Sequence, residues 1–530
     1  MIMNLADYKN KVLGCWMGKN IGGTLGAPDE WARRKNDISF YRQELDGNPL
    51  PNDDLDIQLL WLVALEEQGV DVNSAILSEY WALYVTPHWM EYGTAKINMK
   101  RGLLPPLSGA MDNVFKNSCG AFIRSEIWAC IAPGYPEVAV RYAFEDAMID
   151  HGNGEGVYAE AFCAALESAA FVESDINKLI DIGLSYIPAD SGVAGAVKCA
   201  RECYQLGKTW EEAREEILKH YRGEFFAHWK EISKEDLEKG YADGTLGWDA
   251  PSNIGIVVIG LLYGEGDFGK SLCTAVNCGE DTDCTAATIG SILGIINGVG
   301  AIPEKWMQPI GRSIKTMCIN LGELEDPMYS LPKRWSIPKE RRFTATPGVR
   351  RLVPATIDEL TDRVTRIAKQ VILRNHLDIE IDQSKETDLT GLNKKLLFAG
   401  SDFAAAYEYL NGVVFSFPFF EITVDYAGDA YMKNGANKTI KLRIENKYKT
   451  PATFNFKWHA PDGFRIAPSK QGQIYVSHAF IKNPTEVEFT LSNEEIPASI
   501  NRFIIEITVD GRNTEMLVPV LFLNGNTLQG

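Results

Sequence analysis

Two short stretches of the sequence place several carboxylates at the start of an apolar helix. One is Asn52-Asp53-Asp54-Leu55-Asp56, which precedes the apolar run from Ile57 to Leu65. The other runs from Glu280 through Asp281-Thr282-Asp283-Cys284-Thr285 and is followed by small and apolar residues over 286–300. One Asp can cap a helix, but adjacent carboxylates beside a buried helix repel one another and lose hydration. They need a counter-charge, and a bound cation is the simplest one.

The two acidic stretches share one design, so they could serve one site. Asp53 and Asp56 are three residues apart and can share a helix face. If the two helix starts converge, four or five carboxylates meet at one point. Such an oxygen-rich site suits Mg²⁺, Mn²⁺ or Ca²⁺. The alternatives are two independent helix caps or a solvated acidic loop.

Composition narrows the class of protein. A chain of 530 residues with 45% hydrophobic and 23% charged residues is typical of a globular protein with two or more domains. A formal charge of −18 argues against nucleic acid or an anionic membrane as partner. We find no apolar signal core and no membrane-spanning run. The ten cysteines all fall between Cys15 and Cys318 without a zinc spacing, which favours free thiols and a cytoplasmic location.

The first part of the chain, to about residue 345, is predicted to be all-helical. Closely spaced small residues, as in Gly14-Cys-Trp-Met-Gly18, allow helices to pack tightly. Capping boxes at Thr209-Trp-Glu-Glu212 and Thr356-Ile-Asp-Glu359 mark helix starts, the second for a helix ending near Leu373. The proline-containing segment 320–355 is interpreted as a connection that wraps around the helices.

The remainder of the chain changes to β-branched, period-two runs. These predict an all-β domain, a sandwich of immunoglobulin-like architecture. We therefore expect an all-α domain over 1–375 and a β-sandwich domain over 376–530, with a linker to about 418. The second domain shows no clustered catalytic residues, so its expected role is structural. The candidate strands are Phe419–Tyr426, Thr439–Glu445, Thr453–Trp458, Ile474–Ser477, Glu486–Leu491, Phe503–Val509 and Met516–Leu523.

Several motifs resemble those of the ADP-ribosylglycohydrolase family, in the same order along residues 10–310. Gly14–Gly18 through Gly22-Gly-Thr-Leu-Gly-Ala-Pro-Asp-Glu30 resembles its N-terminal signature. Asn52-Asp53-Asp54 is similar to its Thr-Asp-Asp metal motif, and Asp281-Thr-Asp-Cys-Thr285 to its Asp-x-Asp-Thr motif. Asn117-Ser-Cys-Gly-Ala121 with Arg124 resembles its substrate-contacting glycine loop, and Asp150-His-Gly-Asn-Gly154 stands where the family has a Thr-His motif.

The resemblance implies an all-α fold with a metal centre, usually of two Mg²⁺ ions, and hydrolysis of the bond between ADP-ribose and an acceptor. A metal pair can orient ribose hydroxyls, while carboxylates stabilise an oxocarbenium-like transition state and handle a proton. The implied catalytic residues are Glu30, Asp54 and Asp281. The implied metal ligands are Asn52, Asp53, Asp54, Asp281, Asp283, Cys284 and Thr285, supported by Asp56. The implied substrate contacts are Asn117, Ser118, Cys119, Gly120, His151, Gly152 and Asn153.

The sequence also departs from the family pattern. Gly23 replaces an acidic residue, Asn52 replaces a Thr, and Leu55 replaces a second Thr. Cys284 replaces the Thr that usually ligates metal, and a thiol is a poor partner for Mg²⁺. Either water or Thr285 takes that place, or one metal site is weak, so we expect one or two Mg²⁺ ions, with Mn²⁺ or Ca²⁺ as alternatives.

These observations predict a metal-dependent glycosyl hydrolase. Its expected substrate is a small-molecule or protein-linked ADP-ribosyl, ribosyl or other glycosyl conjugate, cleaved at the anomeric carbon. Homo-oligomers are compatible with this reading, whereas nucleic-acid and membrane partners are not expected. Two alternatives remain: a catalytically silent binding protein that keeps the cleft, and a hydrolase of an unrelated glycoside.

Overall fold

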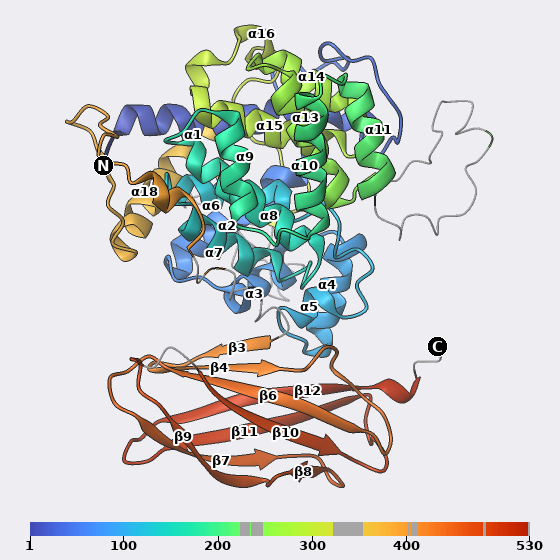
Figure 1. Ribbon diagram of the computed structural model, residues 1–530, viewed down its shortest axis with the longest axis vertical. Coiled ribbons are helices and arrows are strands. Elements are labelled where there is room, and N and C mark those ends of the chain that lie inside the picture. The colour runs from blue at the N-terminus through green and yellow to red at the C-terminus, as the bar shows by residue number, and fades with distance from the viewer. Residues whose placement is uncertain are drawn as a thin grey trace, which may run out of the picture. The chain divides into compact units, whose positions relative to one another are not determined.

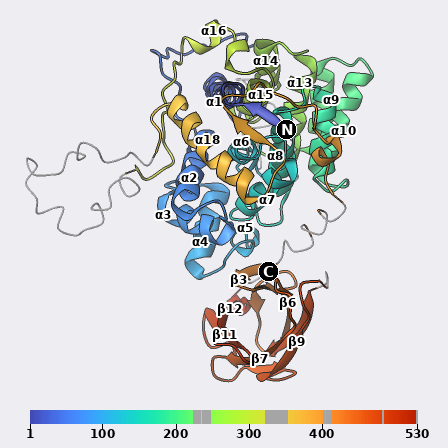
Figure 2. The same cartoon turned by 90° about the vertical axis from the view of Figure 1, so that its left-hand side faces the viewer.

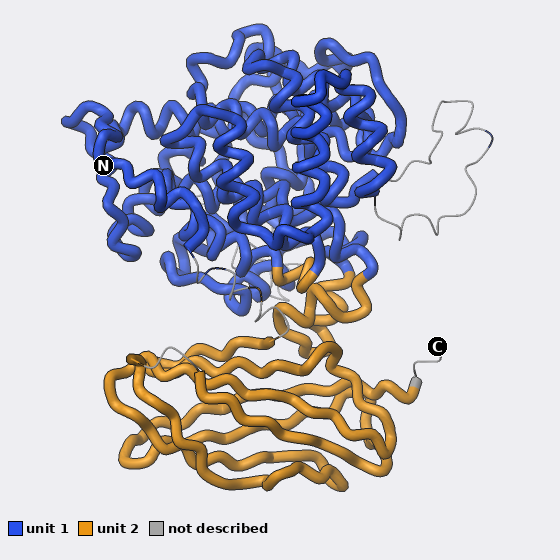
Figure 3. Tube along the Cα trace, in the orientation of Figure 1, with its two compact units in different colours: residues 1–93, 114–147, 154–404 blue, residues 94–113, 148–153, 405–530 orange. Residues whose placement is uncertain are grey.

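The computed structural model describes residues 1–222, 234, 247–321, 353–400, 403, 407, 412–480 and 484–527 (Figure 1). The chain divides into two compact units, coloured separately in Figure 3. The first unit comprises residues 1–93, 114–147 and 154–404, and the second comprises 94–113, 148–153 and 405–530. Most of the predicted connection over 320–355 lies outside the described residues.

The first unit is built from helices, as the sequence predicts. The exception is β1 (Ile2–Asn4), which pairs in parallel with β2 (Glu380–Asp382). None of the described helices is long and apolar enough to cross a membrane. Helix α4 (Met90–Arg101) begins in this unit and continues into the second. The other helices of the unit are α1 (Leu5–Gly26), α2 (Asp53–Gln68), α3 (Ser74–Tyr84), α6 (Glu126–Ile131), α7 (Pro136–Ala147), α8 (Glu155–Ala170), α9 (Ile176–Ser185), α10 (Gly192–Gln205), α11 (Trp210–Tyr221), α13 (Ala250–Tyr263), α14 (Phe268–Cys278), α15 (Thr282–Asn297), α16 (Glu304–Met307) and α18 (Ile357–Arg374).

Helices α1 and α15 lie side by side at the centre of the first unit (Figures 1 and 2). Four glycines of α1 at a spacing of four form a ridge that contacts the backbone of α15. A side chain at any of them would collide with that backbone, so this close approach requires glycine. The glycine ridge consists of Gly14, Gly18, Gly22 and Gly26, whose added Cβ atoms would lie 2.3, 1.9, 2.2 and 2.3 Å from the carbonyl oxygens of Gly294, Gly290, Ala286 and Thr282.

The helix starts show the predicted caps, with one difference. Thr209 and Glu212 form a complete capping box. Thr356 accepts a hydrogen bond from Glu359 N at 3.2 Å, but the Glu359 carboxylate accepts from Ala355 N at 3.0 Å. The second box is therefore shifted by one residue, because the carboxylate of Glu359 reaches the N–H that precedes the cap. Both helices nevertheless begin where the sequence predicts.

The second unit contains two five-stranded sheets, and all seven predicted strands are confirmed. Three strands were missed: β3 (Gly412–Ser416), β5 (Tyr431–Met432) and β8 (Arg465–Ala467), of which β5 and β8 are too short to show a period. All pairings within the sheets are antiparallel except β12 with β5. The first sheet has the order β3 (Gly412–Ser416), β4 (Phe420–Asp425), β6 (Asn437–Asn446), β10 (Thr485–Ser492), β8 (Arg465–Ala467), and the second has β5 (Tyr431–Met432), β12 (Glu515–Asn524), β11 (Ile500–Val509), β7 (Ala452–His459), β9 (Gln471–Val476).

Apolar side chains from both sheets form one buried core, which makes this region a sandwich; the immunoglobulin-like topology stays a prediction. Three residues from a distant part of the chain join that core: Leu103, Leu107 and Met111, beside α5 (Leu107–Ala110). Nearby, the hydroxyl of Tyr431 donates a hydrogen bond to Asp112. The second unit therefore includes residues far upstream of the strands.

Candidate active site

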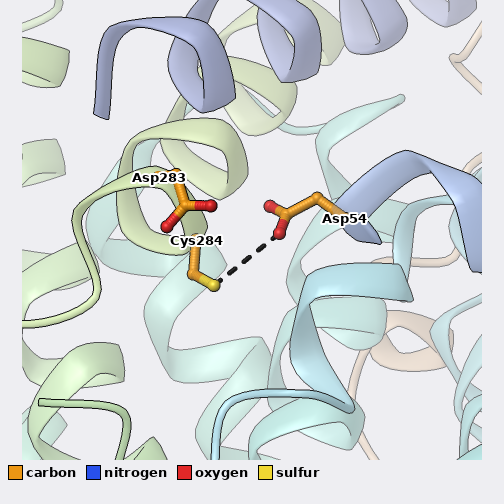
Figure 4. Close-up of side chains that lie close together, drawn as sticks. All are labelled: Asp54, Asp283 and Cys284. Atoms are coloured by element: carbon orange, nitrogen blue, oxygen red, sulfur yellow. Dashed lines mark hydrogen bonds between the residues drawn. The ribbon is translucent and has the colours of Figure 1, made fainter. Parts of the chain in front are cut away.

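The starts of α2 and α15 converge in the first unit. Asn52 caps α2 by accepting from Asp54 N at 2.8 Å, and its Nδ2 donates to Asp283 Oδ2 at 3.0 Å. Cys284 Sγ lies 3.6 Å from Asp54 Oδ1, and Figure 4 shows the carboxylates of Asp54 and Asp283 facing one another. The glycine ridge fixes α15 against α1, and the hydrogen bond from Asn52 joins the start of α2 to the start of α15.

Two groups of side chains at this point could hold a cation. Glu30, Asp281 and Asp283 offer carboxylate oxygens within 4.8 Å of one another, and we call them the oxygen group. Asp54, Asp283 and Cys284 satisfy the same limit, and we call them the thiol group. Asp283 belongs to both groups, so the two lie next to each other.

The centre carries more negative charge than its surroundings compensate. Burial and the neighbouring Asp283 raise the pKa of Glu30 to about 10. The same causes raise the pKa of Asp53 to about 6, although the hydroxyl of Tyr92 opposes the shift by donating to Asp53 Oδ2 at 3.0 Å. Burial also raises the pKa of Asp54 and that of Asp281 well above the usual range. A bound cation would relieve this repulsion.

The donor atoms of the oxygen group fit a hard divalent cation. Asp281 Oδ1 and Asp283 Oδ1 are buried and accept no hydrogen bond from the described residues. Buried carboxylate oxygens normally have a partner, so these two are available to an ion. Cys284 fits such an ion poorly, because Mg²⁺ prefers oxygen ligands, and burial and the charge of Asp281 raise the pKa of its thiol.

Two residues expected at the metal centre, Thr285 as a ligand and Asp56 as its support, also have structural partners. Asp56 Oδ2 accepts from the backbone N–H groups of Met317 at 2.7 Å and Cys318 at 2.6 Å. The Thr285 hydroxyl donates to Thr282 O at 3.3 Å, inside its own helix. Asp56 therefore anchors a downstream loop to α2, and Thr285 is held against the first turn of α15.

Glu280 has its counter-charge in the protein. Its carboxylate lies 3.3 Å from Arg33 Nε and 2.6 Å from Arg222 Nη2. Its backbone oxygen accepts from Trp31 N at 3.0 Å, and both Glu280 and Trp31 have a φ of 67°. The expectation that Glu280 contributes to a cation-requiring cluster is not supported by this geometry. Glu280 instead holds the loop that carries Glu30 beside α15.

Sequence reasoning missed a buried lysine at the centre. Lys19 Nζ lies 3.2 Å from Asp54 Oδ2 and 2.7 Å from Glu126 Oε1, and all three side chains are buried. Burial lowers the pKa of Lys19, but Glu126 and Asp54 outweigh this and raise it above its usual value. The available signal was a charged residue directly after Gly18 in the glycine ridge. The partners could not be foreseen, because they come from distant segments.

The loop 117–120 borders the acidic centre through Cys119. Burial and then Asp281 raise the pKa of the Cys119 thiol. The loop backbone is fixed, since Cys119 N donates to Trp248 O at 2.9 Å and Ala250 N donates to Asn117 O at 2.8 Å. Ser118 forms an isolated β-bridge with Asp249, and a Cβ at Gly120 would lie 2.2 Å from Glu91 Oε1.

Arg124, which follows the loop 117–120, is fully buried. Its Nε donates to Asp146 Oδ1 at 2.9 Å and its Nη1 to Gly120 O at 2.8 Å. The bond to Gly120 O stabilises the backbone of the loop 117–120, and the bond to Asp146 holds the guanidinium in place. The guanidinium therefore positions the glycine loop.

His151, Gly152 and Asn153 belong to the second unit, whereas the acidic centre lies in the first. His151 is buried, with Nδ1 2.9 Å from Asp150 Oδ1. Gly152 has a φ of 56°, and a Cβ there would lie 2.4 Å from Ala110 N. Within this unit the glycine is required by backbone conformation and close packing.

Comparison with known proteins identifies the family. Residues 4–331 match the ADP-ribosylglycohydrolase family, and the chain belongs to it. Its helical part has the fold of that family, which implies a glycosyl hydrolase. Members act on ribosyl or glycosyl conjugates and generally bind divalent metal ions.

Individual relatives share only low sequence identity with this chain. An uncharacterized protein of Archaeoglobus fulgidus is 27% identical over 322 residues, covering 57% of this chain and 91% of that protein. A solved ADP-ribosylglycohydrolase-related protein complex is 20% identical with a TM-score of 0.41, covering 58% of this chain and 94% of that one. A FixG-related protein from Vibrio parahaemolyticus is 13% identical with a TM-score of 0.17, covering 20% of this chain and 98% of that one.

Proposed function

We propose that this protein is a metal-dependent hydrolase that cleaves an ADP-ribosyl or related ribosyl or glycosyl conjugate at the anomeric carbon. The observation that supports this proposal most directly is the convergence of two acidic helix starts. Asp281 and Asp283 each have a buried oxygen there that accepts no hydrogen bond from the described residues. Membership of the family supports the reaction class. The expected ion is Mg²⁺, with Mn²⁺ as an alternative.

The side chains of the centre have three proposed roles: metal binding, charge stabilisation and proton transfer. Asp281 and Asp283 would hold the cation, with Asp53 and Asp54 completing the acidic centre beside them, and the bound cation would orient sugar hydroxyls and stabilise negative charge. The remaining carboxylate charge stabilises the positive charge that develops on the sugar ring as the glycosidic bond breaks. Glu30 is less buried than Asp281 and Asp283, so it is placed to exchange a proton with the leaving group or water.

The loop 117–120 is the proposed binding surface for the substrate. Cys119 borders Asp281, and the loop is held rigid by hydrogen bonds to the segment 248–250. A rigid loop beside the reacting centre can orient a substrate without moving. A contribution from His151, Gly152 and Asn153 is part of the same proposal and is supported by their order in the family motifs.

One observation favours a second candidate, a binding protein without hydrolytic activity. Asp54 already has Lys19 and Cys284 as neighbours, and both reduce its availability to a metal. Such a protein would bind ADP-ribose without releasing an acceptor from any conjugate. Turnover measurements therefore distinguish the two candidates.

The proposal is tested with Asp281→Asn/Asp283→Asn. The double variant removes two charges from the oxygen group while keeping side-chain size, so we expect loss of Mn²⁺ binding and a loss of hydrolysis of at least about 100-fold. Circular dichroism should stay unchanged. The matched control is Asp37→Asn/Asp190→Asn, which removes the same charge from exposed positions. Retained metal binding and turnover in the first variant would refute the proposal.

A further inference from the structure

We infer that the acidic centre binds one divalent cation, on Asp281 and Asp283 of the oxygen group, and that Lys19 supplies the positive charge beside Asp54. The inference rests on the proposed function, because it concerns the same centre. It assigns Lys19 as a positioning residue for Asp54. It also assigns Glu126 as the residue that holds the ammonium from behind.

The first support is the placement of the Lys19 ammonium. It lies 3.2 Å from Asp54 and 2.7 Å from Glu126, and the exposed fractions of Lys19, Asp54 and Glu126 are 1%, 1% and 0%. Lys19 stands directly after Gly18 of the glycine ridge, where α1 contacts α15 backbone to backbone. The helix cannot turn to release the side chain without losing that contact. The ammonium is therefore a fixed part of the centre.

The second support is the contrast between the two groups of ligands. In the thiol group, Asp54 Oδ2 accepts no hydrogen bond from the described residues but forms an ion pair with the Lys19 ammonium at 3.2 Å. Asp54 Oδ1 lies 3.6 Å from the Cys284 sulfur, the contact drawn in Figure 4. In the oxygen group, Asp281 Oδ1 and Asp283 Oδ1 accept no hydrogen bond from the described part of the chain. A hard cation prefers oxygen ligands without competing partners. The oxygen group meets that condition and the thiol group does not.

The third support is electrostatic. An ammonium on Asp54 repels a divalent ion placed in the thiol group, and burial strengthens this repulsion because little water screens it. The same ammonium forms ion pairs with Asp54 and Glu126, and with no carboxylate of the oxygen group among the described residues. The Lys19 ammonium thus takes the place of a divalent cation at the thiol group, and the oxygen group remains available to one cation.

The experiment counts bound Mn²⁺ by equilibrium dialysis and electron paramagnetic resonance. We expect one ion on the wild-type chain. Lys19→Met/Cys284→Thr removes the ammonium and supplies a hydroxyl oxygen, so it should bind two ions and show the spectrum of a coupled pair. The matched control is Glu126→Gln, which breaks the ion pair between Lys19 and Glu126 but leaves the pair between Lys19 and Asp54. This variant should still bind one Mn²⁺ ion.

The possible results separate this inference from the proposed function. Two ions on the wild-type chain overturn the inference and leave the proposed function intact. One ion on a folded Lys19→Met/Cys284→Thr variant, with native circular dichroism, also overturns it. Absence of Mn²⁺ binding by the wild-type chain overturns both. The wild-type count alone can refute the inference, so it stays testable even if the double variant does not fold.

Discussion

The acidic centre and the two sheets bury opposite kinds of side chain. Around the starts of α2 and α15, Asp54, Asp281 and Asp283 are buried together with Lys19. In the described parts of 412–527, by contrast, no charged side chain is buried. The buried polar side chains there are Thr423, Asn446, Asn493 and Asn501.

This difference separates packing from chemistry. Burying a charge costs several kcal/mol unless a partner compensates it, so packing alone does not explain the carboxylates of the centre. The sheets are stabilised by apolar contact, which any well-shaped set of side chains can supply. We therefore expect substitutions in the sheets to change stability and substitutions at the centre to change metal binding and turnover.

The largest expected effect on stability is from Phe489→Ala. The Phe489 ring is fully buried and packs edge to face on Phe456 and Trp458, each at a centroid distance of 5.2 Å. Its truncation leaves a cavity and should cost about 3–5 kcal/mol in urea unfolding. Mn²⁺ affinity below the transition should not change. The control is Tyr475→Ala at an exposed position of β9, and weakened Mn²⁺ binding in the Phe489 variant would contradict the separation.

The converse prediction concerns Glu30→Gln. The amide keeps the shape of the side chain but cannot transfer the proton, so kcat should fall by about 100-fold, ~2.7 kcal/mol in barrier. The folded state should lose no stability, because the pKa of Glu30, raised to about 10, leaves its side chain uncharged near neutral pH and the amide keeps its shape. Steady-state hydrolysis and thermal unfolding measure the two effects, with exposed Glu44→Gln as control. A kcat within threefold of wild type would exclude Glu30 from the proton transfer.

The sequence predicts local patterns better than long-range partners. Helices α2 and α15 and seven strands could be predicted, because apolar periodicity and helix capping depend only on residues that are neighbours in the sequence. The convergence of Asp54 with Asp283 could be proposed, since both stand at starts of buried helices. The lysine beside Asp54 could not be foreseen, because its contact depends on how α1 packs.

The same reasoning explains the other sites that were missed. The hydrogen bond from Tyr92 to Asp53 and the arginines around Glu280 join segments that nothing in the sequence relates. Leu103 and Leu107 read as ordinary apolar residues of a helical region, yet they pack in the core of the strand-containing unit. Local patterns identify such residues as buried but do not identify what buries them.

A third prediction uses pH to measure uncompensated charge. The pKa of Asp53 is raised to about 6 and that of Glu30 to about 10, so the folded protein without metal holds protons that the unfolded chain releases near pH 4. Stability in EDTA should therefore fall as the pH rises from 5 to 8. Asp53 alone should contribute about 1–2 kcal/mol. Thermal unfolding at both pH values measures this fall.

Divalent metal provides the control for the pH effect. Excess Mg²⁺ or Mn²⁺ binds the ionised centre of the folded state, so it should reduce the fall in stability between pH 5 and 8. The Asp37→Asn/Asp190→Asn variant should behave like wild type. Equal stability at both pH values in EDTA would mean that the carboxylates of the centre are already compensated within the protein.

The smallest expected effect on activity is from removing the sheets. A chain ending at Gly400 keeps β2, which pairs with β1, whereas a chain ending at Arg374 loses that pairing. Both lose the strands that pack on Leu103, Leu107 and Met111 and so expose these side chains. The longer chain should be the more stable of the two, and aggregation through the exposed leucines should be relieved by Leu107→Gln.

The chain ending at Gly400 contains every residue proposed for the acidic centre, including Lys19 and the loop 117–120. We expect it to bind Mn²⁺ with wild-type stoichiometry and to retain hydrolysis within about tenfold, ~1.4 kcal/mol in barrier. Dialysis and steady-state kinetics on one conjugate measure both properties. A folded, metal-bound chain without turnover would show that residues after Gly400 contribute to substrate binding. In that case the sheets would serve chemistry as well as packing, and the contrast between the two regions would fail.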